Sequence, residues 1–326
     1  MEQNQNNQAQ GNNSQVQHQH QNHQTHSTQH NSNQNENKKH WYDRWYKRML
    51  LPPVILLIIC LIYLFTFYSQ TGDIIYKDSS LSGGTTITLK AELNIEGLKS
   101  YLEQAVDNVN IRKIADLSTG KQIAILIDSS AEPAILKPLV EEFIGYKLTN
   151  ENSSVEFSGS TLGKNFYKQL VTAVIISFIL MSFVIFVLFR TFIPSIAVIF
   201  AAFADIVMTL AMVDILGIRL SVAGIAAFLM LIGYSVDTDI LLTSAVLKKR
   251  GDTVNKRIHR AFKTGIFMTL TGLVAVIPAF FIVTGLPDSF RQIFLILGLG
   301  LFADIINTWL TNASIIKWYS DYKKMN

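Results

Sequence analysis

Residues 231–242 read LIGYSVDTDILL and place two acids, Asp237 and Asp239, inside an apolar run long enough to cross a bilayer. An aspartate at the centre of a membrane helix costs roughly 2.5–3.5 kcal/mol, whereas a leucine, isoleucine, phenylalanine or valine there contributes only about 0.3–0.6 kcal/mol. Acids at this depth therefore need a role. Either they join neighbouring helices through hydrogen bonds, or they carry a proton or another ion through the membrane.

The chain as a whole has the composition of an integral membrane protein. Hydrophobic residues make up 49% of the sequence and charged residues only 16%. Six apolar segments are each long enough to span a bilayer as a helix, at residues 49–68, 169–189, 192–213, 220–247, 264–286 and 290–316. We therefore expect an all-α bundle of six transmembrane helices, with helices two to six in residues 169–316.

The basic residues predict the orientation of this bundle. They precede the first span at Arg44 and Arg48, join the second and third spans at Arg190, and follow the sixth span at Lys317. The most basic connection, KKRGDTVNKRIHRAFK at residues 248–263, joins the fourth and fifth spans. All of these segments fall on one side, which the positive-inside rule makes cytoplasmic. We expect a multi-pass protein of the cell membrane with both termini in the cytoplasm.

The two ends of the chain are assigned to that same side. Residues 1–40 are rich in Gln, Asn and His and lack an apolar period, so they are predicted to form a disordered cytoplasmic tail. Residues 317–326 form a short cytoplasmic C-terminal end.

One large soluble segment, residues 70–165, lies between the first and second spans and hence on the extracytoplasmic side. TTITLKA (85–91), VNIRKIADL (109–117), KQIAILID (121–128) and SSVEFSG (153–159) have the pattern of strands. NIEGLKSYLEQAV (94–106) and PAILKPLVEEFIGYKL (133–148) have helical periodicity, the first behind a capping Asn94. The order β-α-β-β-α-β is typical of an α+β ferredoxin-like domain.

Further polar residues lie at membrane depth. Asp205 is near the middle of the third span, and Asp304 is near the middle of the sixth. Asp304, Asn307, Thr308 and Thr311 follow one another at helical spacing and form one polar stripe. Because several acids in six helices are costly in lipid, this stripe is predicted to face protein.

The fourth span offers a choice between its two acids. Asp237 shares a helix face with Gly233 and Tyr234, whereas Asp239 lies about 200° around the helix. We expect Asp237 to face the interior, because Gly233 permits close helix approach and Tyr234 can donate a hydrogen bond. A relay is favoured over a structural role for Asp237, the two are equally favoured for Asp205 and Asp304, and Asp239 is assigned a structural role.

Patterns for other chemistry are weak or missing in the sequence. SGGTT at residues 82–86 leads into a strand rather than opening a helix, so it is not a phosphate-binding loop. His259 is the one histidine beyond the N-terminal tail region, and it lies in a basic loop, so no Ser/His/Asp set can be assembled. We expect no enzymatic activity, no metal site, no nucleic-acid partner and no cofactor except a coupling ion, either a proton or sodium.

Several stretches together resemble the SecD/SecF family of protein-export membrane proteins, within the resistance-nodulation-division superfamily. They are SLSGGTTI (80–87), GSTLGKNFYKQLVTAVI (159–175), FRTFIPSIAVIFAAFAD (189–205), GYSVDTDILLTSAVLKK (233–249) and RAFKTGIFMTLTGLVAV (260–276). The resemblance covers about residues 50–320. Within the family, the sequence is similar to the archaeal form of the SecF branch. It implies a six-helix half-transporter that pairs with a SecD-like subunit beside the Sec translocon. Its outer domain would engage unfolded preprotein, driven by the proton motive force.

The resemblance also suggests roles for particular residues. Asp237 matches the transmembrane carboxylate of the SecD-type VDAN pattern, whereas the acid of bacterial SecF falls on Thr238. Asp205 matches the acid of a His-Asp pair, with Ala204 in place of the histidine, and Arg260 matches an arginine that opens the fifth span. Arg260 either acts on the relay acids or anchors the helix at the cytoplasmic face. Tyr234, Gly233, Thr238 and Asn307 are the expected supporting residues.

Two other functions are compatible with the sequence. A proton-coupled small-molecule exporter of the same superfamily would normally carry both halves in one chain. A structural membrane subunit without transport would use its aspartates only to join helices. Substitution of Asp237 by Asn distinguishes a relay from a structural subunit, because it removes a titrating group. The change would stop a relay and leave a structural subunit functional.

Overall fold

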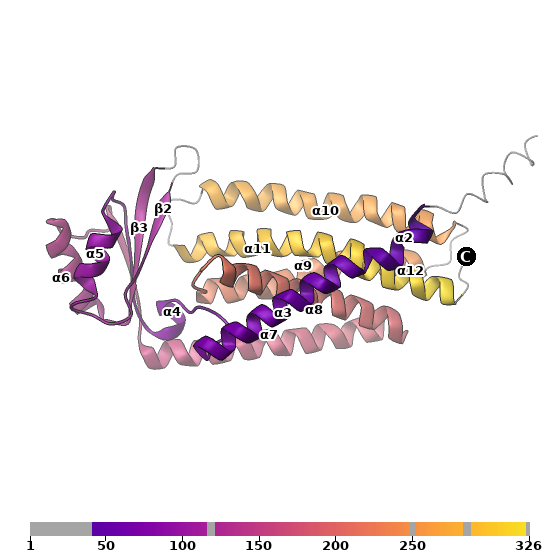
Figure 1. The fold of residues 1–326 in the computed structure, drawn as a ribbon, viewed down its shortest axis with the longest axis horizontal. Coiled ribbons are helices and arrows are strands. Elements are labelled where there is room, and N and C mark those ends of the chain that lie inside the picture. The colour runs from indigo at the N-terminus through magenta and orange to yellow at the C-terminus, as the bar shows by residue number, and fades with distance from the viewer. Residues whose placement is uncertain (1–40, 116–120, 248–251, 283–287, 324–326) are drawn as a thin grey trace, which may run out of the picture. The chain divides into compact units, whose positions relative to one another are not determined.

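The computed structural model describes residues 41–115, 121–247, 252–282 and 288–323. The predicted disordered tail at residues 1–40 lies outside the described residues. Within them, six helices are long and apolar enough to cross a membrane. The number and order of the predicted spans are thus confirmed (Figure 1).

The helices extend beyond several of the predicted spans. The helical elements outside the sheet domain are α2 (Trp41–Met49), α3 (Leu51–Thr71), α4 (Ser79–Ser82), α7 (Ser160–Phe189), α8 (Phe192–Ile215), α9 (Val222–Leu247), α10 (Val254–Ile282), α11 (Asp288–Ile306), the π-helical turn η1 (Asn307–Asn312) and α12 (Ala313–Tyr322). α10 begins at Val254 rather than at residue 264, because the polar residues before the apolar run are also helical. α11, η1 and α12 follow one another directly and carry the last span to Tyr322.

A small sheet domain separates α4 from α7. Its elements are β1 (Gly84–Leu89), α5 (Ile95–Leu102), β2 (Asn110–Ala115), β3 (Gln122–Ser129), α6 (Pro133–Ile144) and β4 (Ser153–Ser158). The strand order is β2-β3-β1-β4, and every neighbouring pair is antiparallel. The ferredoxin-like order is confirmed, and Asn94 caps α5 by accepting from the backbone amides of Glu96 and Gly97.

The core of the sheet domain lies between the sheet and its two helices. Ile87 of β1 pairs with Ile127 of β3, and both side chains are fully buried. Leu98 of α5 and Leu136 of α6 belong to the same apolar cluster, so both helices cover one face of the sheet (Figure 1). The alternation of apolar residues along β1 and β3 thus determines which face receives the helices.

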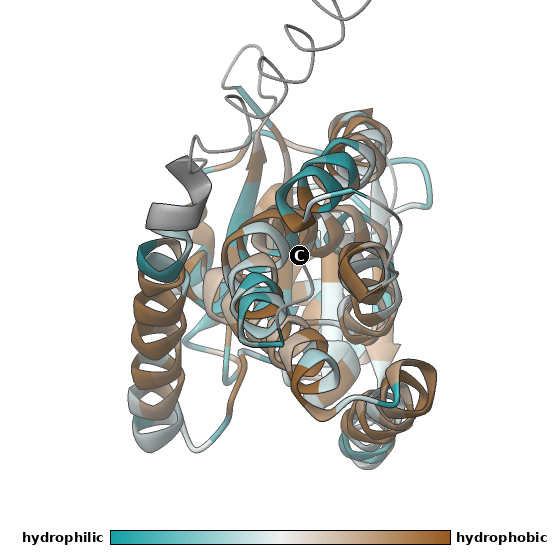
Figure 2. Ribbon diagram, turned by 90° about the vertical axis from the view of Figure 1, so that its right-hand side faces the viewer, coloured by the Kyte–Doolittle hydropathy of each residue, from teal (hydrophilic) through white to brown (hydrophobic). Residues whose placement is uncertain are grey.

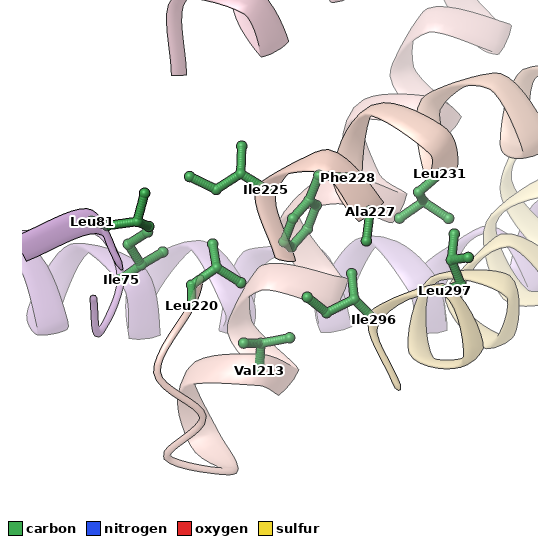
Figure 3. Packing of buried hydrophobic residues seen from close by; sticks show 10 residues of the cluster. All are labelled: Ile75, Leu81, Val213, Leu220, Ile225, Ala227, Phe228, Leu231, Ile296 and Leu297. Atoms are coloured by element: carbon green, nitrogen blue, oxygen red, sulfur yellow. The ribbon is translucent and has the colours of Figure 1, made fainter. Parts of the chain in front are cut away.

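The sheet domain is attached to the membrane helices by more than chain connectivity. Before β1, the Asp78 amide donates to the Leu220 carbonyl at 3.1 Å, and the Leu220 amide donates to the Tyr76 carbonyl at 2.6 Å. Leu220 lies in the turn between α8 and α9. Ile75 and Leu81 also join an apolar cluster with Val213, Phe228, Ile296 and their neighbours (Figure 3). The segment that leads into the sheet is therefore packed against α8, α9 and α11.

The six spans differ in how deeply they are buried within the chain. In the most apolar stretches of α8 and α9, 61% and 56% of residues are buried, against 6% for α7 and 11% for α10. α3 packs on α8 through Leu57, Cys60 and Leu64. Figure 2 shows most of the spans nearly end-on, with extensive brown segments, as expected for helices whose outer faces meet lipid or another apolar partner. The centre of the bundle is formed by α8, α9 and α11.

Candidate functional site

Three aspartates are fully buried where the central helices meet. Asp205 comes from α8, Asp239 from α9 and Asp304 from α11, and none of the three residues is exposed. Among the described residues, their carboxyl oxygens accept hydrogen bonds from hydroxyls and side-chain amides. We call these three acids and their partners the carboxyl cluster. Three charged carboxylates in such surroundings would repel one another without a compensating cation.

Asp205 is held from two other helices. The Ser235 hydroxyl of α9 donates to Oδ2 of Asp205, and Nδ2 of Asn307 donates to Oδ1 at 2.7 Å. The Asp205 side chain thus joins α8 to α9 and to the π-helical turn. These bonds explain why a polar residue is tolerated in a helix whose surroundings are otherwise apolar.

A threonine hydroxyl bridges the other two acids. Oγ1 of Thr308 lies 2.9 Å from Oδ1 of Asp239 and 2.9 Å from Oδ1 of Asp304. A hydroxyl has one proton to donate but can also accept a hydrogen bond. Both contacts are therefore hydrogen bonds only if one of the two carboxyls is protonated and donates to Thr308. The geometry describes two carboxyl groups joined through one intervening hydroxyl.

The two acids differ in their remaining contacts. Oδ1 of Asp304 also accepts a hydrogen bond from Thr238 Oγ1 at 2.9 Å, and Oδ2 of Asp304 lies 3.4 Å from Thr269 Oγ1 of α10. Oδ1 of Asp239 accepts a hydrogen bond from Nδ2 of Asn312 at 2.7 Å. Oδ2 of Asp239 has no hydrogen-bond partner within the described part of the chain. The supporting role predicted for Thr238 and Asn307 corresponds to direct bonds to Asp304 and Asp205. Asp239 retains one buried oxygen that can take a proton without breaking a bond.

A change of helical pitch brings the polar residues of the last span together. Residues Asn307–Asn312 form a π-helical turn, a feature that often lies at functional sites. The predicted stripe of Asp304, Asn307, Thr308 and Thr311 is buried, so the expectation that it faces protein is confirmed. The π turn adds Asn312, which the regular helical spacing did not include.

The prediction that Asp237 faces the interior is wrong for this chain. Asp237 is exposed, and Tyr234 retains 52% of its accessible surface. A Cβ added to Gly233 would meet no atom within 4 Å, so Gly233 makes no close helix contact. The side of α9 that packs on α8 and α11 instead carries Ser235, Thr238 and Asp239.

Sequence reasoning thus missed Asp239 and Ser235 as members of the cluster. A usable signal was present in the spacing of the positions that α9 buries. One series of these positions recurs at intervals of three and four residues: Gly224, Phe228, Leu231, Ser235, Asp239, Leu242 and Val246. An apolar pattern on both sides of the helix concealed this signal.

Arg260 lies apart from the carboxyl cluster. Its side chain is 62% exposed, and Nη2 lies 2.7 Å from Oδ2 of Asp252, in the connection between α9 and α10. Nine residues separate Arg260 from Thr269, which amounts to about 13 Å along α10. In this structure the arginine therefore occupies the position of a helix-end anchor, and its predicted action on the acids stays a prediction.

Comparison with known proteins gives one consistent family. The model of the C-terminal region of the protein-export membrane proteins SecD/SecF matches residues 140–322. The protein-export membrane protein SecF of Methanolacinia petrolearia is 36% identical over 274 residues, covering 84% of this chain and 93% of that protein. SecF of Methanocaldococcus jannaschii is 37% identical over 246 residues, covering 74% of this chain and 86% of that protein.

A solved structure has a similar fold. The crystal structure of SecDF from Thermus thermophilus, described as a translocon-associated membrane protein, superimposes with a TM-score of 0.70 at 18% identity. The match covers 87% of this chain and 39% of the SecDF chain. At this identity the likeness concerns the fold, with six membrane helices and a small sheet domain.

Proposed function

The chain belongs to the SecF proteins of the SecD/SecF protein-export family, and we propose that its carboxyl cluster carries the ion that couples the proton motive force to export. The observation that carries this proposal is the Thr308 hydroxyl placed 2.9 Å from both Asp239 and Asp304. This geometry supports the proposal because a hydroxyl between two acids at membrane depth is suited to exchange one proton between them. The proposed ion is accordingly a proton rather than sodium.

The residues divide the transfer into short steps. Asp239 has a free buried oxygen on which a proton can be loaded, and Thr308 connects its other oxygen to Asp304. Thr238 Oγ1 lies 2.9 Å from Oδ1 of Asp304 and 2.9 Å from the carbonyl oxygen of Ser235, whose side chain donates to Asp205, so these bonds position Asp205 beside the pair but do not extend the proton path to it. Thr308 would take the proton of Asp239 while it gives its own proton to Asp304, and this exchange would pass one proton from α9 to α11 without a charged group entering lipid.

The same helices hold the sheet domain, which provides a route to mechanical output. α8 and α9 are joined by the turn that bonds to Tyr76 and Asp78, and α11 supplies Gln292, whose Nε2 donates to the Arg219 carbonyl of that turn at 2.7 Å. If protonation alters how α8 and α11 pack around Asp205 and Asp304, both attachments shift together. We propose that this shift moves the sheet domain, which engages unfolded preprotein beside the Sec translocon.

The family relationship indicates a SecD-like partner in the Sec pathway. We propose that this partner covers the outward face of α9, where Met230, Gly233, Tyr234 and Asp237 are exposed. A carboxyl facing lipid is costly, so a protein neighbour is the favoured surrounding for Asp237. The proposal places both chain termini in the cytoplasm and the sheet domain on the opposite side, as the basic connections predict.

A matched pair of substitutions tests the coupling role. Asp239→Asn keeps the acceptor that binds Asn312 and Thr308 but abolishes titration, whereas Asp237→Asn makes the same change on the opposite face of α9. One proton moved through 100 mV yields about 2.3 kcal/mol, equivalent to a factor of about 50 in an equilibrium. We expect Asp239→Asn to lose the uncoupler-sensitive part of reporter-preprotein export at normal abundance, and Asp237→Asn to keep most of it.

The other outcomes have distinct meanings. Loss of export in Asp237→Asn alone would assign coupling to the outward acid and refute a relay centred on Asp239. Normal, uncoupler-sensitive export in both variants would leave the aspartates as structural bonds between helices. The small-molecule exporter function has no support among the relatives named above, which are protein-export proteins.

A further inference from the structure

A second polar site lies far from the carboxyl cluster, where the sheet domain meets the ends of the membrane helices. A cavity of about 340 Å³ opens there. Phe67 and Thr71 line it from the last turns of α3, Ser129 and Ser130 line it from the end of β3, and Arg219 lines it from the turn between α8 and α9. The volume is within the range of small-molecule and headgroup sites.

Arg219 is held in position by its backbone. Its carbonyl accepts a hydrogen bond from Nε2 of Gln292 at 2.7 Å, and the next residue, Leu220, is bonded to Tyr76 and Asp78 on its two sides. The Arg219 side chain is half-buried, yet no hydrogen bond or ion pair to its guanidinium is found within the described residues. Burial lowers the pKa of this guanidinium, and the nearby charges of Asp128 and Asp78 oppose that change. A half-buried guanidinium on a fixed backbone, with no hydrogen bond or ion pair among the described residues, is suited to bind an anionic group.

The other charges around the cavity are already paired, but Asp73 pairs through Oδ1 and keeps a second carboxyl oxygen on an exposed side chain. Lys77 is bonded to Asp73 at 2.8 Å, and Arg112 to Asp128 at 3.3 Å. Asp73 and Asp128 both line the cavity together with Arg219. A ligand that carries only negative charge would satisfy Arg219 but face these two acids. A zwitterion, with one anionic and one ammonium group, satisfies both.

The position of the cavity indicates where such a ligand comes from. Phe67 and Thr71 are in the last turns of a membrane helix, so the cavity lies at the depth of lipid headgroups. We propose that it binds the zwitterionic headgroup of an aminophospholipid in the leaflet on the sheet-domain side. The phosphate bonds to Arg219, the ammonium group bonds to Asp73, and the apolar Phe67 and Ile75 contact the adjoining glycerol and acyl region.

Lipid titration of the purified full-length chain tests this proposal. Dissociation constants for short-chain phosphatidylethanolamine and phosphatidylglycerol are measured by native mass spectrometry for the parent chain and four variants. We expect phosphatidylethanolamine to bind at least fivefold more tightly than phosphatidylglycerol. Arg219→Gln should weaken phosphatidylethanolamine binding at least tenfold, and Asp73→Asn should reduce the preference between the two lipids.

The remaining variants are controls. Arg291 is a half-buried arginine on α11 that contacts the Phe280 ring and does not line the cavity, so Arg291→Gln should change binding less than twofold. Arg219→Lys keeps the charge but not the forked donor geometry, so it should melt like the parent chain and bind with intermediate affinity. A difference between Arg219→Gln and Arg219→Lys at equal melting temperature excludes misfolding as the cause.

Three results would overturn the assignment. The first is unchanged phosphatidylethanolamine binding in Arg219→Gln. The second is phosphatidylglycerol binding as tightly as phosphatidylethanolamine, which would indicate a plain anion site. The third is equal Arg219-dependent binding of free phosphoethanolamine or of a soluble Asp-Lys dipeptide, which would assign the cavity to a soluble zwitterion or to polypeptide instead of lipid.

Discussion

Replacing Thr308 by valine removes one hydroxyl from the centre of the carboxyl cluster and keeps the shape of the side chain. Thr308 Oγ1 makes two contacts of 2.9 Å, one to Asp239 on another helix and one to Asp304 one turn earlier. Hydrogen bonds between membrane helices contribute about 0.6 kcal/mol on average and up to about 1.7 kcal/mol. Loss of both contacts should therefore destabilise the chain by roughly 1–3 kcal/mol.

The effect on export should be larger than this loss of stability implies. Without the hydroxyl, no atom connects Oδ1 of Asp239 to Oδ1 of Asp304 through Thr308, so a proton held between the two acids loses its path. We expect the uncoupler-sensitive part of reporter export to fall at least tenfold in Thr308→Val. Thr308→Ser restores a hydroxyl and should restore most of that export.

Thr311 supplies the matched control. It is also buried in the π-helical turn, but its hydroxyl has no hydrogen-bond partner within the described residues. Thr311→Val should therefore leave export unchanged and should be neutral or slightly stabilising in thermal unfolding of the purified chain. Equal export by Thr308→Val and Thr311→Val, at equal abundance, would show that the Thr308 bridge is not part of the ion path.

Two further predictions concern stability. A Cβ on Gly300 would lie 2.3 Å from Cδ1 of the buried Leu231, whereas one on Gly298 would meet only Val276 at 3.8 Å. Gly300→Ala should therefore destabilise the folded chain by about 0–2 kcal/mol, despite a gain in helix propensity of about 1 kcal/mol. Gly298→Ala should stabilise the folded chain by up to about 1 kcal/mol. Unfolding midpoints measure both changes, and the opposite ranking of the two variants would contradict the packing of α9 against α11. Burial raises the pKa of Asp78 from 3.8 to about 7, with Asp128 and Glu156 adding to the rise and Ser80 opposing it. Because the folded chain binds more protons than the unfolded chain between these values, stability should fall as pH rises from about 4 to about 7, by on the order of a few kcal/mol, and the slope should flatten above that range. Asp78→Asn keeps an acceptor for Ser80 and should lose this part of the pH dependence, and parallel pH profiles for the two chains would refute the assignment.

The fold could be predicted largely because its signals are local. Apolar runs of sufficient length define the spans, and strand alternation with a capped helix at Asn94 defines the sheet domain. The ends of the spans were less predictable, because residues such as Arg257 and Lys263 are polar yet continue α10 by regular backbone hydrogen bonding. Nothing in the spacing of residues 304–312 predicted a π-helical turn, which depends on how the last span packs against α8 and α9.

The site was predicted in composition but not in orientation. Asp205, Asp304 and Asn307 could be identified because polar residues at membrane depth are few and their positions are explicit in the sequence. Choosing between Asp237 and Asp239 required the rotation of α9 about its axis. In a span that is apolar on all sides, the hydrophobic pattern does not specify that rotation, and contacts such as Gly300 against Leu231 determine it instead.

The two acids of the DTD stretch therefore face opposite sides of one helix. Asp239 is buried and accepts hydrogen bonds from Thr308 and Asn312 of the π-helical turn, whereas Asp237 is exposed on the described part of the chain. A partner that covers Asp237 would then lie only one helix diameter, about 10 Å, from the carboxyl cluster. In such an assembly α9 would be the wall between the cluster and the neighbouring subunit. A change of protonation in the carboxyl cluster would then alter the packing of α9 against the neighbouring subunit, and a change at Asp237 would alter the packing of α9 against the cluster.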